Sequence, residues 1–228
     1  MSLESWIALL GWGTLVGVDL VSLPQMMIAR PLVAGTVAGA ILGDLDAGLK
    51  LGVVFELLQY DILPVGAVRY PEYGPATVAA VATAHAAGTL GLGLGAVVGL
   101  VTGLVGGVTI HLLRRVNSRI VNAAAAALES GDPRVLVRLH VAALVRDGAR
   151  AALVTAAGLG LAWIGRPLLA GVPSPREVSI FTLLCVAAVA AALAAGAAGT
   201  LRLVGRGPNL AWFAAGLGGG VVVAIWLR

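Results

Sequence analysis

A few acidic and amide side chains interrupt an otherwise apolar stretch, and they are the residues most able to do chemistry. Glu56 and Gln59 lie three positions apart in "LKLGVVFELLQYD", and Glu72 follows in "RYPE". Carboxylate and amide oxygens accept hydrogen bonds, and a carboxylate can also bind and release a proton. The pattern therefore suggests either the binding of a polar ligand or the transfer of a proton or ion.

Helical spacing places Glu56 on a glycine-lined face. On a helix, Gly48, Gly52 and Glu56 follow one another at i, i+4 spacing, so the carboxylate points toward a packed interior. A charged group at membrane depth costs at least about 2.5 kcal/mol, which makes such an acid a functional candidate. The alternative is that Glu56 lies at a solvated hairpin tip, where it needs no functional explanation.

The composition of the chain indicates an integral membrane protein. Hydrophobic residues make up 59% of 228 residues, charged residues only 11%, and the mean hydropathy is +0.99. Residues 73–113 carry no charge and are long enough for two crossings of about 20 residues each. Residues 178–201 and 207–227 each supply one more, and residues 151–165 a shorter one. We expect an all-α, polytopic helical bundle that forms a single membrane domain over residues 1–228.

The basic charge is concentrated in residues 114–150, between an N-terminal membrane half (1–113) and a C-terminal one (151–228). This segment has seven arginines and three acids, which accounts for the whole net charge of +4. By the positive-inside rule it should lie in the cytoplasm. Its pattern predicts two amphipathic helices separated at Gly131 to Pro133, against the membrane surface or a partner. A solvated linker is the alternative, and no nucleic-acid partner is expected because aromatic residues are not interleaved.

The uncharged runs of the N-terminal third are too short to cross a membrane. They cover residues 5–18, 20–29, 31–43 and 51–55. Such pieces suggest broken helices or re-entrant hairpins, which are tolerated only where protein or a water-filled cavity surrounds them. The proline positions at which breaks are expected are Pro24, Pro31 and Pro64.

Glycines repeat every four residues in two places, at positions 35, 39 and 43 and at positions 91, 95, 99, 103 and 107. Small residues at this spacing allow helices to approach backbone to backbone, so both segments should be closely packed.

Motifs of soluble enzymes are missing from the sequence. The three histidines lack metal-ligand spacing, the lone cysteine Cys185 excludes an intramolecular disulfide, and there is no phosphate-binding loop or dinucleotide fingerprint. We therefore predict no catalytic residue, metal ligand or cofactor.

The run from Arg30 to Glu72 resembles the N-terminal region of the IIC subunits of the mannose/fructose/sorbose family of the bacterial sugar phosphotransferase system. The elements that carry this resemblance are Arg30, Pro31, Gly43, Asp44, Gly48, Gly52, Glu56, Pro64, Gly66 and Pro71. The chain departs from the family at Glu72, where the family has aspartate, and at Arg69, Tyr70 and Tyr73, where it has smaller residues.

The resemblance implies a multi-pass protein of the bacterial inner membrane that binds a hexose and translocates it without carrying the phosphoryl group. It also implies a IID membrane subunit, cytoplasmic IIB and IIA proteins, and a higher oligomer of the IIC–IID pair. The sugar ligands expected from it are Glu56, Gln59, Glu72, Gln25 and Asp19. We assign Asp44 mainly to structure, as the cap of a helix that begins near Ala47.

Two other functions are compatible with the sequence. One is an ion- or proton-coupled carrier that uses Glu56 as its titrating group. The other is a scaffold or sensor without transport activity that binds cytoplasmic phosphotransferase proteins on its arginine-rich helices.

Overall fold

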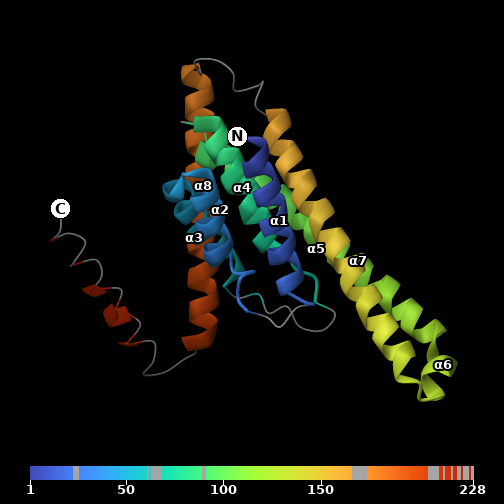
Figure 1. Cartoon of the computed structure of the whole chain (residues 1–228). Helices are drawn as coiled ribbons and strands as arrows, with labels where there is room; N and C mark the ends of the chain where they lie inside the picture. The colour runs from blue at the N-terminus through green and yellow to red at the C-terminus, as the bar shows by residue number, and fades with distance from the viewer. Residues whose placement is uncertain are drawn as a thin grey trace.

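A computed structural model describes residues 1–22, 26–60, 62, 68–88, 91–165 and 174–204, with scattered positions from 211 to 226. These residues form helices and connecting turns, without a strand among them. The helices are α1 (Leu3–Asp19), α2 (Pro31–Leu42), α3 (Leu45–Gln59), α4 (Tyr73–Ala87), α5 (Gly91–Ala123), α6 (Ala125–Glu129), α7 (Pro133–Gly165) and α8 (Pro175–Val204). The all-α prediction is therefore confirmed for this part of the chain (Figure 1).

Two of these helices are long and apolar enough to cross a membrane. They are α5, with 33 residues, and the part of α8 from Pro175 to Ala198. Large apolar side chains on the outer face of α8, such as Leu183 and Leu193, are exposed. Such surfaces fit a helical membrane protein, in which lipid or another membrane protein covers them. The predicted crossing at residues 207–227 lies mostly outside the described residues.

Helices α2 and α3 form a tight hairpin whose turn is set by local sequence. Pro31 begins α2, and Gly43 ends it in the left-handed conformation, with φ of 69°. Asp44 then caps α3, because its Oδ1 accepts a hydrogen bond of 3.2 Å from the amide of Ala47. This is the structural role expected for Asp44.

The glycines at positions 35, 39, 48 and 52 bring the backbones of α2 and α3 into direct contact. A Cβ atom on Gly48 would lie 2.5 Å from the carbonyl oxygen of Gly35, and one on Gly35 would lie 2.6 Å from that of Gly48. Larger side chains would therefore push the two helices apart. Close backbone approach is how helices associate where lipid provides no hydrophobic driving force.

Helix α4 is the buried centre of the bundle. Every residue from Tyr73 to Ala84 is buried, and α1, α2, α3, α5 and α7 all pack on it. Its alanines face the second glycine repeat on α5, where a Cβ atom at Gly95 would lie 2.6 Å from the carbonyl oxygen of Ala80. The close packing predicted from the glycine repeats is thus present at Gly35, Gly39 and Gly95, whereas Gly43 ends α2 and has nothing within 4 Å of a Cβ atom.

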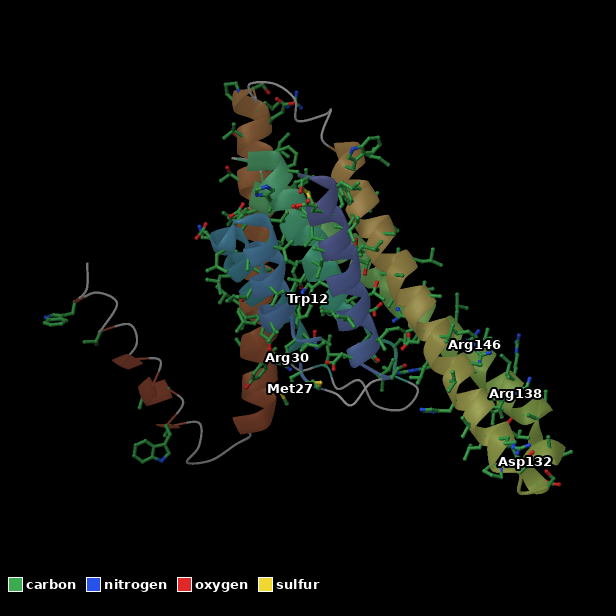
Figure 2. All side chains as sticks on the ribbon, in the orientation of Figure 1. Trp12, Met27, Arg30, Asp132, Arg138 and Arg146 are labelled. Atoms are coloured by element: carbon green, nitrogen blue, oxygen red, sulfur yellow. The ribbon has the colours of Figure 1, made fainter. Side chains whose placement is uncertain are left out.

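The basic segment extends from the bundle as a helical arm, defined here as residues 114–146 (Figure 1). The predicted turn is present, since Gly131 has φ of 74° and Pro133 begins α7. The two halves, however, are continuations of α5 and α7 rather than separate surface helices, with only the short α6 at the tip. Between residues 108 and 130 there is no proline or glycine, so nothing in the sequence ends α5 at the membrane boundary. Figure 2 shows Arg146, Arg138 and Asp132 at successive positions toward the tip.

We predict that Gly48→Ala destabilises the protein by about 1–3 kcal/mol, because the added methyl group overlaps the α2 backbone. Gly11→Ala on α1 is the matched control, since nothing lies within 4 Å of a Cβ atom there. It should be neutral or slightly stabilising. The midpoint of unfolding in detergent measures both, and equal midpoints for the two variants would contradict this view of the hairpin.

Candidate functional site

A buried arginine connects the helices at the centre of the molecule. Arg150 on α7 makes a bidentate ion pair with Glu72, with Nη1–Oε2 and Nη2–Oε1 distances of 2.6 and 2.9 Å. Its Nε donates a hydrogen bond of 2.8 Å to Oδ1 of Asp147. The side chain of Glu72 is completely buried, and that of Arg150 is 8% exposed.

The remaining hydrogen-bonding groups of this centre are also satisfied. Arg150 donates from Nη2 to the carbonyl oxygen of Gly17, at 3.2 Å, and from Nη1 to Oγ1 of Thr109, at 3.4 Å. All five N–H donors of the guanidinium therefore have partners. Oδ2 of Asp147 accepts a hydrogen bond from the hydroxyl of Ser22. A buried charge is stable only in such a network, so this centre is closed to further ligands in this conformation.

Asp19 organises the segment that leads into α2. Its two carboxylate oxygens accept hydrogen bonds from the backbone amides of Met26 and Ala29, at 2.8 and 3.1 Å, and the residue is buried. Met27 between them has an unfavourable positive φ of 62°. Asp19 thus stabilises an irregular turn directly before Arg30.

Glu56 is paired as well, but it retains exposed surface. Its Oε1 forms an ion pair with Arg30, and its Oε2 accepts a hydrogen bond of 3.1 Å from the amide of Leu32 in the first turn of α2. An anion at a helix N-terminus is stabilised by the helix dipole. The side chains of Arg30 and Glu56 are 41% and 20% exposed. Figure 2 shows Arg30 beside Met27 at the end of the bundle where α2 begins.

The predicted site residues therefore fall into two groups. Glu72 and Asp19 are buried, whereas Glu56, whose oxygens are also paired, is partly exposed. Gln59 is buried in the last turn of α3, one turn beyond Glu56. Gln25, Pro64 and Gly66, which the sequence also singles out, lie outside the described residues. Pro71, another of the motif residues, immediately precedes Glu72.

Arg150 and Asp147 are residues of this centre that the sequence analysis does not place among the site residues. Both fall in the basic segment 114–150, yet both are buried in the bundle. Their i, i+3 spacing of opposite charges, directly before the apolar residues 151–165, is the signal that distinguishes them from the exposed arginines of the arm.

Metal-ligating side chains do not gather anywhere in the described part of the chain: no three histidine, cysteine, aspartate or glutamate residues there could hold a metal ion together. One histidine has a clear structural role, because Nδ1 of His85 lies 3.2 Å from Oδ2 of Asp44.

Comparison with known proteins identifies similar sequences. Residues 5–217 match the family described as PTS system sorbose-specific IIC component. The sorbose-specific EIIC component of Klebsiella pneumoniae is 32% identical over 131 residues, which are 58% of this chain and 49% of that protein. The mannose-specific EIIC component of Escherichia coli K12 is 25% identical over the same shares. For the fructose permease IIC component of Bacillus subtilis, identity is 28% over 55% of this chain and 46% of that protein.

These matches cover about half the length of the relatives. A solved structure described as a membrane protein has the same fold, with a TM-score of 0.72 over 100% of this chain and 96% of that one, at 18% sequence identity.

We predict that Arg150→Leu destabilises the protein by about 3–5 kcal/mol, because it leaves Glu72 and Asp147 charged and buried without a partner. The double variant Arg150→Leu/Glu72→Leu should be less destabilised than the sum of the two single variants, as unfolding in detergent can measure. Lys50→Leu, which breaks the exposed Lys50–Asp46 pair, is the control and should change stability by less than about 1 kcal/mol. Strict additivity of the two single substitutions would mean that the buried pair is not coupled.

Proposed function

Since this chain belongs to the family of sorbose-specific IIC components of the bacterial phosphotransferase system, we propose that it is the sugar-translocating subunit of a mannose-type complex. In this proposal it binds a hexose and passes it to a cytoplasmic IIB protein, which phosphorylates the sugar. The observation that carries the proposal is the family match over residues 5–217, which covers the described helices α1 to α8 except for the first two residues of α1.

The helix lengths support a multi-pass position in the bacterial inner membrane. At 1.5 Å per residue α5 is about 50 Å long, whereas the hydrocarbon core of a bilayer is about 30 Å thick. The end that carries the arginines of the arm therefore extends into the cytoplasm, as the positive-inside rule requires. In the same proposal α1 to α4, none longer than 17 residues, are broken or re-entrant segments enclosed by the longer helices.

Glu56 is the sugar ligand that the geometry favours. Its carboxylate is partly exposed at the junction of α2 and α3, where Arg30 and the amide of Leu32 fix its orientation. Sugar hydroxyls donate hydrogen bonds to carboxylates, and an oriented carboxylate loses little entropy on binding. Gln59, one turn away, and Gln25, from the segment before Arg30, complete the proposed set of ligands.

Glu72 and Asp19 fit a positioning role better than direct contact with the sugar. Their carboxylate oxygens accept hydrogen bonds from the protein, as those of Glu56 do, but both residues are buried whereas the Glu56 side chain is 20% exposed. Asp19 stabilises the turn that places Arg30, and Arg30 holds Glu56. In this proposal both acids act on the sugar site through the segments that they hold in place.

The proposed partners are a IID membrane subunit, with which the chain forms a higher oligomer, and the cytoplasmic IIB and IIA proteins. The exposed apolar face of α8 provides a surface suited to a membrane partner. The arm, beyond the membrane, provides a basic surface suited to a cytoplasmic one.

We predict that Glu56→Gln lowers hexose uptake at least tenfold while the protein still assembles with its partners, because the neutral amide is a weaker acceptor for sugar hydroxyls. The assay is uptake of labelled hexose by cells that express the chain with the IID-like and IIB-like proteins of its chromosomal neighbourhood. Asp46→Asn is the matched control, since this exposed acid lies on the same helix away from Glu56.

Three results of this assay would contradict the proposal. Full uptake without the phosphoryl donor or the IID-like protein would exclude a phosphotransferase subunit. Transport by the purified chain alone, with a pH dependence that Glu56→Gln removes, would identify an ion-coupled carrier. Binding of cytoplasmic phosphotransferase proteins without any uptake would identify a scaffold.

A further inference from the structure

A groove of about 330 Å³ lies at the base of the arm, between residues 69–71 and α5. Its walls are mostly apolar, with Leu104, Val108 and Leu112 along α5 on one side and the buried Tyr70 on the other. These three side chains of α5 are exposed. They lie four residues apart on a helix that is apolar enough to cross a membrane, so they form an exposed apolar strip suited to contact with lipid.

The end of the groove nearest the arm is cationic. Arg69 and Arg115 line it together with His111, and Arg114 lies behind Tyr70, donating a hydrogen bond of 2.9 Å to its hydroxyl. The Nε2 atom of His111 is buried, and it has no hydrogen-bond partner among the described residues.

This positive charge is not balanced by nearby acids in the part of the chain that the structure describes. Arg150 and Arg30 each have a carboxylate partner, whereas Arg69 and Arg115 have none among the described residues. The nearest acid along the chain, Glu72, has both oxygens committed to Arg150. An anion in the groove would therefore gain charge-assisted hydrogen bonds without displacing an existing ion pair.

The order of apolar and cationic surfaces indicates what kind of anion fits. The apolar strip runs along the membrane-spanning part of α5, and the cationic end begins where α5 enters the arm. Phospholipids present the same order, with acyl chains in the hydrocarbon layer and a phosphate at its boundary. Basic pockets at the cytoplasmic boundary are suited to anionic lipid head groups.

We propose that this groove binds an anionic phospholipid of the cytoplasmic leaflet, with its phosphate between Arg69 and Arg115 and an acyl chain along the apolar strip of α5. The proposal rests on the membrane placement of α5 and not on sugar transport. Because residues 69–71 lead directly to Glu72, a bound lipid also stabilises the segment that carries the partner of Arg150.

The test uses the protein purified in mild detergent, with bound lipid measured by native mass spectrometry during titration with phosphatidylglycerol or with phosphatidylcholine of the same acyl chains. Wild type should bind phosphatidylglycerol at least tenfold more tightly than the zwitterionic lipid. Arg69→Ala/Arg115→Ala should lose this preference. The control Arg134→Ala/Arg138→Ala removes the same charge near the tip of the arm and should retain it.

Several outcomes would overturn the proposal. Equal binding of the two lipids would show that the groove does not recognise an anionic head group, and an equal loss in both double variants would indicate general charge attraction. If millimolar inorganic phosphate alone displaces the lipid, the site is one for free phosphate. If the alanine variant fails to fold, Arg69→Gln and Arg115→Gln provide the same comparison, because glutamine disturbs packing less. An unchanged preference for phosphatidylglycerol in both glutamine variants would reject the site.

Discussion

A guanidinium group inside a helical membrane protein is stable only if its charge and all five of its N–H donors are satisfied, and Arg150 meets this requirement by contacting three separate segments besides its own helix. Its partners come from the end of α1, the residue before α4, the middle of α5 and the preceding turn of α7. None of these segments can move away without leaving a buried N–H donor of the guanidinium without an acceptor. The constraint fixes where α1, α4 and α7 meet, and hence where the irregular turn before α2 begins.

Glycine makes this polar centre sterically possible. A Cβ atom on Gly106 would lie 2.6 Å from Oε2 of Glu72, and one on Gly17 would lie 3.2 Å from Oε1. The same residue type allows α2 to lie against α3 and α4 against α5. Close backbone contact thus serves two purposes, because it packs the helices and it leaves just enough space for one carboxylate between them.

Local features of the fold could be predicted from sequence, because their causes are local. The cap at Asp44 and the turn at Gly131 depend on residues within a few positions of one another, and the spacing of the glycine repeats marks the face along which a helix can be closely approached. The Arg150–Glu72 pair could not be predicted, since its members are far apart in sequence. An acid at membrane depth suggests ligand binding, but sequence alone does not distinguish an accessible carboxylate such as Glu56 from one that a distant arginine has already neutralised, such as Glu72.

The arm is continuous with the helices that hold the centre of the molecule together. Helix α7 runs without interruption from Pro133 near the tip to Arg150, and α5 runs from the tip to Gly103, whose carbonyl oxygen accepts a hydrogen bond of 2.8 Å from the amide of Glu72. Figure 1 shows both helices passing from the bundle to α6. Helices α5 and α7 therefore connect the tip of the arm directly to the Arg150 centre. The tip is thus connected to Arg150 through continuous helix, and to Glu72 through α5 and one backbone hydrogen bond.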